Sequence, residues 1–459
     1  MAQPAKTNVL EGSITRHVLR MLGPFSIAII AMISTGIVDT IYLGRLTDAA
    51  RPNLAIMALA ALGFAFPLTF IGNSANIGLG AGTMSAVSRA LGQGENERAR
   101  RHAAAAILLG LFIMTILVSL MLSVAQFILP MAGASAEVAR MAFSYLVISL
   151  PGLVVLSISS MCNNILRAAG EAALPSSIMI MGAVINVILD PFLIFGWGPF
   201  PRMEVAGAAM ATLIGNIIGA CFGFYLVFFH RKAMSFVGMT FGSIKRAWII
   251  IGQVGLPAAV TNIIVPVATF TAVAIIGNVL SETDVAAFTI TSRAELISVG
   301  MLYALSACIG AITGRNGGAG NTGRVREAFN VCYLICVIWS TVMALIIALF
   351  APQIAAIFTN DGVLIEKALP YFYLVPITIF GYGFVFISSA GLNAIGRPVY
   401  GFTYTVIRSL FLYVGLIFIG VQTAGLTGAY IGLAAANIVS GLIAIYWTLK
   451  RVPMSAKKS

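Results

Sequence analysis

The chain has 459 residues, of which 59% are hydrophobic and 9% are charged. Soluble domains are about 45–50% apolar and about 25% charged, and a soluble fold of this length could not bury so much apolar surface. The composition therefore excludes a soluble globular domain. It also excludes a disordered chain, which would need few apolar residues and many charges. A polytopic membrane protein is left.

The formal net charge is +12 at pH 7. The basic residues lie between long apolar runs rather than along one face or in one tail, so we interpret them as determinants of membrane topology and expect no nucleic-acid partner. All five cysteines lie inside apolar runs, and we expect them to be reduced and buried, since neither a histidine nor a second cysteine pair completes a metal site. The cysteines are Cys162, Cys221, Cys308, Cys332 and Cys336.

Apolar residues gather in twelve continuous runs, each long enough to cross a bilayer, for which about 20 residues suffice. A membrane β-barrel would instead show alternating strands of about ten residues, so the expected fold class is an all-α polytopic membrane protein. The second and seventh runs exceed one crossing, and we expect them to tilt or protrude into solvent. The runs are 18–43, 54–88, 103–129, 139–163, 176–197, 206–229, 247–280, 285–313, 327–350, 368–391, 399–420 and 426–449.

The lysines and arginines are distributed unevenly between the two sides of this twelve-span topology. With the N-terminus inside, 20 of the 27 lie in inner segments, five lie in outer segments, and Arg293 and Arg408 lie within spans. Positive residues concentrate on the cytoplasmic side of membrane proteins. We therefore predict a multi-pass protein of the inner (plasma) membrane with both termini in the cytoplasm.

The two halves of the sequence resemble each other, which predicts a repeat of six spans. A unit with an even number of spans keeps its orientation, so the repeat is parallel. We predict an N-lobe over 1–229, a cytoplasmic linker over 230–246 and a C-lobe over 247–459, facing each other around a central cavity. The matched residues are Gly207 and Asn216 with Gly428 and Asn437 at an offset of 221, and Gly94, Arg98 and Arg100 with Gly320, Arg324 and Arg326 at an offset of 226.

Three motifs in this framework are specific. The first span contains Pro24 and Asp39, the first long inner loop reads Gly92-Gln-Gly-Glu, and the fifth span contains Asn186-x-x-x-Asp190-Pro191. With the two six-span lobes, these motifs make the whole chain similar to the multidrug and toxic compound extrusion (MATE) transporters, and Asp39 and the Asn-x-x-x-Asp-Pro block resemble the DinF-like branch. The NorM-like branch has acids in the seventh and tenth spans, where this chain has none.

The resemblance implies a secondary active multidrug exporter that exchanges organic compounds outward for inward H⁺ or Na⁺ by alternating access. We expect the compounds to be cationic and amphipathic. The sequence shows no phosphate-binding loop, zinc-protease motif or nucleophile elbow, so we expect neither an enzyme nor a cofactor. Two alternatives are a flippase for lipid-linked precursors from a related superfamily and a membrane receptor that transports nothing.

Two acids within predicted spans are the candidates for ion coupling, because an ionisable side chain at the bilayer centre costs roughly 2.5–3.5 kcal/mol on insertion scales. Asp39 lies late in the first span, where the resemblance implies an essential acid; an interfacial acid at the outer end is the alternative. Asp190 shares a helix face with Asn186, and Pro191 removes a hydrogen-bond donor from the backbone. A helix end near the surface is the alternative for Asp190. Pro24 and Pro191 are predicted helix kinks.

Further polar residues in the predicted spans are weaker candidates for the same network. The resemblance makes an asparagine of the fourth span, Asn163 or Asn164, and Thr212 of the sixth span possible members. Asn216 lies one turn after Thr212, and its repeat partner is Asn437, so a role in helix packing is equally consistent with its position.

Glu295 and Arg293 lie on the predicted eighth span, two residues apart, and therefore point to nearly opposite helix faces. Each needs another partner, and Arg408 of the eleventh span is a candidate for Glu295. A structural ion pair and substrate binding are both consistent with this pattern. An offset of 226 residues places Thr69 opposite Glu295, so the N-lobe has no matching acid.

The coupling ion is expected to be H⁺, because two carboxylates carry more charge than one Na⁺ neutralises, whereas protonation lowers the cost of burial directly. Na⁺ bound by Asp39, Asp190 and Asn186 is the alternative, and no firm metal site is predicted. The expected partners are small-molecule substrates and the lipid bilayer, and we expect a monomer.

Overall fold

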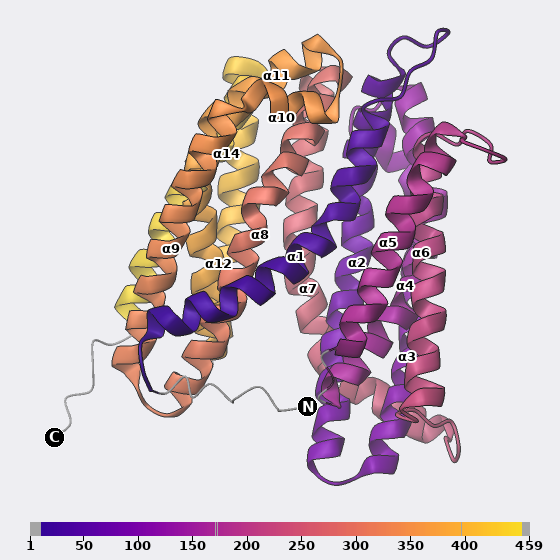
Figure 1. Ribbon diagram of the computed structural model, residues 1–459, viewed down its shortest axis with the longest axis vertical. Helices are drawn as coiled ribbons and strands as arrows, with labels where there is room; N and C mark the ends of the chain where they lie inside the picture. Colours follow the sequence, from indigo (N-terminus) through magenta and orange to yellow (C-terminus); the bar gives the residue numbers. More distant parts are fainter. Residues whose placement is uncertain (1–10, 170, 172, 396, 452–459) are drawn as a thin grey trace. The chain divides into compact units, whose positions relative to one another are not determined.

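The computed structural model describes residues 11–169, 171, 173–395 and 397–451, and within these ranges every regular element is a helix (Figure 1). The all-α fold class is therefore confirmed. The elements are α1 (Ile14–Leu43), α2 (Leu54–Gly92), α3 (Asn96–Met131), α4 (Ala136–Ala168), α5 (Ala173–Phe195), α6 (Val205–Tyr225), η1 (Leu226–His230), α7 (Phe241–Val279), α8 (Glu282–Gly318), α9 (Thr322–Leu349), α10 (Ala351–Phe358), α11 (Gly362–Leu374), η2 (Pro376–Thr378), α12 (Ile379–Ala394), α13 (Pro398–Val406), η3 (Ile407–Tyr413) and α14 (Val414–Arg451).

The predicted spans can be compared with helices that are long and apolar enough to cross a membrane. The described residues contain nine such helical segments and one bent pair, 282–296 with 298–314. The first predicted span, 18–43, lies in α1, where the side chains of 24–35 are outside the described part of the chain. Helices α2 and α7 have 39 residues each, which corresponds to about 58 Å. Both are longer than the roughly 30 Å hydrocarbon core, as expected.

One apolar segment, Val399–Arg451, has 53 residues and contains the two last predicted spans. Its helix breaks at Ala424 and Gly425, and Gly425 has φ 59°, a left-handed conformation that glycine adopts without strain. The chain then reverses its direction. The backbones of Gly420 and Gly428 lie so close together that a side chain added at Gly420 would overlap the carbonyl oxygen of Gly428. Spans 399–420 and 426–449 are therefore two antiparallel helices in close backbone contact.

The helices divide into two compact packing units, Met1–Ile37 with Ile290–Ser459, and Val38–Thr289. In the second unit, α2 packs against α4 and α7, α4 against α3 and α6, and α5 against α6. In the first unit, α12 packs against α9, α13 and α14. The predicted lobes 1–229 and 247–459 with the linker 230–246 follow the sequence repeat rather than packing, and they stay a prediction.

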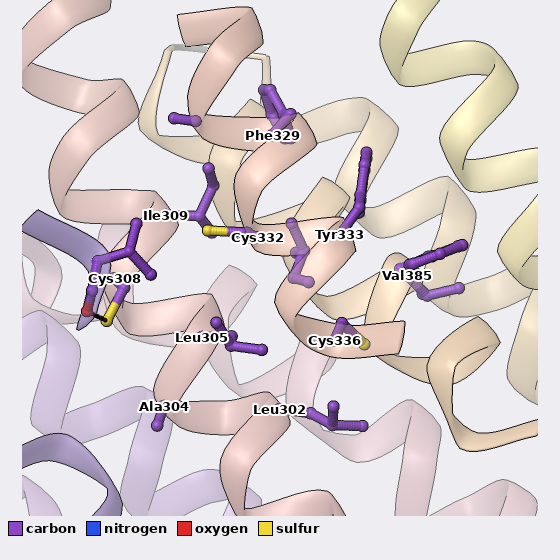
Figure 2. Packing of buried hydrophobic residues seen from close by; sticks show 14 of the residues in the cluster. Leu302, Ala304, Leu305, Cys308, Ile309, Phe329, Cys332, Tyr333, Cys336 and Val385 are labelled. Carbon is purple, nitrogen blue, oxygen red and sulfur yellow. Dashed lines mark hydrogen bonds between the residues drawn. The ribbon is translucent and has the colours of Figure 1, made fainter. Parts of the chain in front are cut away.

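A hydrophobic cluster in the first unit joins the start of α1 to α8, α9 and α12 (Figure 2). Three of the five cysteines belong to it, and the Cys308 thiol lies 4.0 Å from the backbone oxygen of Val18. All five cysteines are free thiols, and Cys162 is buried in the second unit. The prediction of burial is wrong for Cys221, which is exposed on α6. The reason is that an apolar run in a membrane helix can face lipid as well as protein.

The α14 hairpin gives a prediction about stability. Gly428→Ala should lower the thermal midpoint of the purified protein, since the new methyl group overlaps backbone that cannot move without separating the two helices; overpacking of this kind costs about 1–3 kcal/mol. The matched control is Gly415→Ala, in the same helix, where an added Cβ meets nothing within 4 Å and helix propensity favours alanine. Thermal unfolding in detergent checks both variants. Equal midpoints for Gly428→Ala and the parent would contradict the hairpin packing.

Candidate coupling site

A buried carboxyl pair lies in the unit Val38–Thr289. Asp39 lies one turn before the end of α1 and Asp190 lies near the end of α5, and these residues are 4% and 0% exposed. The carboxyl groups of Asp190 and Asp39 lie close enough to interact directly. An ionised carboxylate can only accept hydrogen bonds, so a proton on one of the two groups would turn this contact into a hydrogen bond. Both acids are enclosed by protein although they lie near the ends of their helices.

Two polar neighbours hold Asp190 in place. Asn186 lies one helical turn earlier on the same face of α5, and its amide donates to Asp190 at 3.4 Å and to the Thr212 hydroxyl of α6 at 3.0 Å. Asn186 is 3% exposed. The packing of α5 on α6 joins Asp190 and Asn186 to Thr212, and Asp39 of α1 lies beside Asp190. The sequence had nominated all four residues. Their role in coupling stays a prediction.

Two prolines were predicted to kink the helices that carry the carboxyl pair, and the structure describes the side chain of one of them, Pro191. Helix α5 continues through Pro191 to Phe195, and the Val187 carbonyl lacks its usual amide donor because proline carries no N–H. That carbonyl, the Asp190 carboxyl and the Asn186 amide lie within one helical turn. Pro24 lies within α1, but its side chain is outside the described part of the chain, so its predicted kink stays a prediction.

The other nominated asparagines make contacts between and within helices. Asn163 is 9% exposed on α4, and the Asn164 amide donates to the Ser160 carbonyl at 2.8 Å. The Asn216 amide lies 3.5 Å from the Gly152 carbonyl, linking α6 to α4. Within the described residues, the side chains of Asn164 and Asn216 donate to backbone carbonyls rather than to Asp39 or Asp190.

Asn437, the repeat partner of Asn216, makes a corresponding contact in the other unit. Its amide lies 3.4 Å from the hydroxyl of Thr378, and Thr378 lies 226 residues after Gly152. Asn216 of the sixth span contacts the fourth span at Gly152, and Asn437 of the twelfth span contacts the tenth span at Thr378. The two contacts therefore occupy equivalent places in the repeat. This correspondence supports the helix-packing interpretation of Asn216.

A second buried polar cluster lies in the unit that contains 290–459. Glu295 on α8 lies beside the Tyr371 hydroxyl and interacts electrostatically with Arg408. Among the described residues no ion pair within 4.0 Å joins Glu295 to Arg408, so the predicted direct pair is replaced by a wider network. The Arg408 guanidinium donates to Asn437 at 3.2 Å and lies 3.2 Å from the centroid of the Tyr382 ring. A desolvated cation–π contact contributes about 2 kcal/mol.

Most residues of this second cluster lie where the backbone departs from regular α-helix. Helix α8 bends by 46° between 282–296 and 298–314, directly after Glu295. Thr378 ends the 3₁₀-helix η2, and Arg408 lies in the π-helix η3. Such irregularities inside a span are tolerated where side chains satisfy the freed backbone groups, and they often mark functional sites. Arg293 is 8% exposed on the same helix as Glu295.

Sequence reasoning did not nominate Tyr371, Tyr382 or Thr378. Tyrosine is frequent in apolar spans, and the spacing of tyrosines along the sequence does not indicate which of them lies beside a charged group in the folded protein. The available signal was Pro376, which cannot continue a helical hydrogen-bond pattern and therefore indicated a break in the tenth span beside Thr378.

An ionic cluster beyond the ends of α1 and α5 was also missed. Arg51 forms ion pairs with Asp48 at 2.9 Å and with Glu204, and Arg202 lies 3.5 Å from Glu204. The Ala50 amide and then the Arg51 guanidinium lower the pKa of Asp48, so this carboxylate is ionised at neutral pH. Since Glu204 lies 153 residues from Arg51, no local pattern could indicate the contact. The cluster joins the connection between α1 and α2 to the connection between α5 and α6.

The oxygen atoms at the carboxyl pair also bear on metal binding. The described residues contain no group of three or more His, Cys, Asp or Glu side chains that could hold a metal ion. The pair itself offers two carboxyl groups, the Asn186 amide, the Thr212 hydroxyl and the Val187 carbonyl. Carboxylates and freed carbonyls at a broken helix hold either Na⁺ or H⁺ in transporters, so this donor set is chemically suited to both ions.

Comparisons with known proteins agree with this geometry. The MatE family model matches residues 24–192 and 257–419. A protein of Shewanella oneidensis named "FAD transporter" is 29% identical over 97% of this chain and 96% of its own length. A protein of Thermotoga maritima named "Probable multidrug resistance protein NorM" is 25% identical over 90% of this chain and 88% of its own. A solved structure described as the inward-facing conformation of a multidrug resistance MATE family transporter is 24% identical, with a TM-score of 0.84 over 95% of this chain and 98% of that one.

The fold and the buried polar residues within its spans define a membrane transporter. The predicted fold class is confirmed: an all-α polytopic membrane protein of two six-helix lobes. The chain belongs to the MATE family. The resemblance deduced from Asp39, the inner loop and the Asn-x-x-x-Asp-Pro block is therefore confirmed at the level of the family.

The second polar cluster gives a prediction about stability rather than coupling. Glu295→Gln should lower the thermal midpoint and the folded yield, because it removes the negative charge that compensates the buried Arg408 guanidinium; loss of a charged hydrogen-bond partner costs about 1–3 kcal/mol. The control is Glu366→Gln, which removes the same charge from an exposed position of α11. Thermal unfolding and size-exclusion yield measure both. An unchanged midpoint for Glu295→Gln would show that the cluster does not serve stability.

Proposed function

We propose that the protein is a secondary active exporter that moves organic compounds out of the cell in exchange for inward H⁺, by alternating access. It works as a monomer, without a cofactor, in the inner (plasma) membrane with both termini in the cytoplasm. The observation that carries this proposal is the close approach of the buried carboxyl groups of Asp39 and Asp190, because a proton shared by these groups lowers the cost of charge within the membrane.

The geometry supports H⁺ over Na⁺ for a physical reason. Two carboxylates in contact repel each other strongly when both are ionised away from water, and one proton removes that repulsion. A second proton leaves the pair uncharged, whereas a single bound Na⁺ leaves a net negative charge in a buried site. The Asn186 amide donates a hydrogen bond to Asp190 and holds this carboxyl in place during the cycle.

The cargo is proposed to be an amphipathic organic compound, and the cationic compounds expected from the sequence are the first candidates. The name of the Thermotoga relative, a probable multidrug resistance protein, supports multidrug transport. A second candidate is FAD or a similar dinucleotide, favoured by the name of the Shewanella relative, which matches 97% of this chain. FAD carries a negatively charged diphosphate, and Arg293 and Arg408 are buried guanidinium groups of opposite charge.

Neutralising either coupling acid should abolish coupled export without harming the fold. Asp39→Asn and Asp190→Asn keep the size of the side chain but cannot release a proton, and removal of a charge from the bilayer eases insertion. Because the two acids share one network, the double variant should be no worse than either single one. Efflux driven by an imposed pH gradient, normalised to folded protein, measures the effect.

Glu327→Gln is the control for that experiment, since Glu327 is an exposed acid at the start of α9, and it should retain full efflux. Near-normal, pH-dependent efflux by Asp190→Asn would overturn coupling through the carboxyl pair and would direct attention to Glu295.

The ion and the cargo can be separated with purified protein in vesicles. Either a pH gradient or a Na⁺ gradient is imposed, and movement of a fluorescent organic cation or of FAD is followed. We expect the pH gradient alone to drive transport. Transport driven by Na⁺ alone at equal pH would refute H⁺ coupling, and movement of FAD but not of the cation would decide between the two cargoes.

A further inference from the structure

A cavity apart from the coupling site opens where α3 and α7 begin, in the unit Val38–Thr289. Its volume is about 620 Å³, and it is lined by Arg98, Arg101 and Arg246 together with the apolar Met239, Ile249 and Ile250. A smaller hollow of about 140 Å³ shares Arg98 and Ile250 with it. The charge bias of the sequence predicts that this end of the helices faces the cytoplasm. The cavity therefore lies where α3 and α7 enter the membrane.

The cavity carries an excess of positive charge. Its one acidic lining residue, Glu97, is already paired with Arg100 at 2.7 Å, and Arg98 is paired with Glu95 at 2.7 Å. Among the described residues, Arg101 and Arg246 have no carboxylate within 4.0 Å. Two guanidinium groups that face a shared hollow without a counter-charge repel each other, so an anion bound between them would be stabilised.

Two helix N-termini add to the positive potential. Helix α3 begins at Asn96 and α7 begins at Phe241, and the arginines of the cavity lie in their first two turns. The N-terminus of a long helix carries about half a positive elementary charge, and it favours bound anions such as phosphate groups. Both the side chains and the backbone of this cavity therefore favour a phosphate.

The apolar part of the site indicates a lipid rather than a soluble phosphate. Ile249 and Ile250 continue from the basic residues along α7, as an acyl chain continues from its headgroup. The linker beside the cavity exposes Phe241 by 82%, Val237 by 80% and Phe236 by 43%. Exposed aromatic and aliphatic side chains next to arginines are typical of segments that lie at the boundary between headgroups and acyl chains.

We propose that this cavity binds one anionic phospholipid, with its phosphate held by Arg98, Arg101 and Arg246 and an acyl chain packed along Ile249 and Ile250. Basic pockets between membrane helices on the cytoplasmic side bind lipid headgroups in this way. The bound lipid joins the first turns of α3 to the linker and the start of α7, and it stabilises that end of the unit.

The repeat shows that the site belongs to one half of the chain. At an offset of 226 residues, Arg101 corresponds to Glu327 and His102 to Ala328. Arg324, the counterpart of Arg98, donates to the Gly12 carbonyl and to Asn316, both at 3.0 Å. The matching loop is thus occupied by contacts within the protein, and one lipid per chain is expected.

The test measures the binding of phosphatidylglycerol to the purified full-length protein in detergent, by native mass spectrometry and by the rise in thermal midpoint. Arg101→Gln and Arg246→Gln, singly and together, are compared with Lys245→Gln. Lys245 is an exposed neighbour of Arg246 outside the cavity lining, so this control removes the same charge from the same helix turn. Phosphatidylcholine and glycerol 3-phosphate serve as the uncharged-lipid and soluble-phosphate probes.

We expect one phosphatidylglycerol to bind the parent and Lys245→Gln equally, with at least tenfold weaker binding to the double arginine variant and no stabilisation by either comparison probe. The arginines are exposed, so the variants should unfold at the parental midpoint in lipid-free detergent. Equal weakening by Lys245→Gln would reduce the effect to general surface charge and would overturn the site. Equal stabilisation by glycerol 3-phosphate would show a soluble-anion site instead, and unchanged binding to the double variant would refute the proposal.

Discussion

The hydrocarbon core of a bilayer offers no hydrogen bonds, so a chain that crosses it must satisfy its polar groups from within the protein. For the backbone this leaves helices, and the described residues form no other regular element. For side chains it means that a polar group in a span needs a partner on a neighbouring helix. Asn437 meets Thr378 and Arg408 for this reason, and Asn186 meets Thr212.

Lipid is as apolar as a protein core, so burial of apolar surface does not hold membrane helices together. Membrane helices associate instead through close contact of their backbones, which glycine permits because it has no side chain. The contact of Gly420 with Gly428 turns one 53-residue apolar segment into two spans. The exposed Cys221 illustrates the same principle from the opposite side, since an apolar side chain of α6 loses nothing by facing lipid.

The two halves share their helix order but differ in their polar chemistry. The carboxyl pair of Asp39 and Asp190 lies on helices that continue past it without a break in α5. In the other half, Glu295, Thr378 and Arg408 lie at a bend, a 3₁₀ turn and a π-helix, and the charged groups there are a carboxyl group and a guanidinium group. The loops differ likewise, because Arg101 faces a cavity where its counterpart is Glu327. A repeated architecture therefore carries one buried carboxyl pair, one charged network and one basic surface pocket.

The sequence by itself determined the membrane class, the helical spans, the repeat and the family, because these depend on composition and period, which are local. It also nominated Asp39, Asp190, Asn186 and Thr212, because a polar residue in an apolar span is visible without knowledge of its neighbours. Which of them meet was decided by tertiary structure: Asn163, Asn164 and Asn216 are equally polar but contact other groups. Tertiary structure also decided which tyrosines surround Arg408, that Arg51 pairs with Glu204, and that arginines of α3 and α7 line one cavity. Each joins residues far apart in the chain, and only the folded backbone sets the distance between such groups.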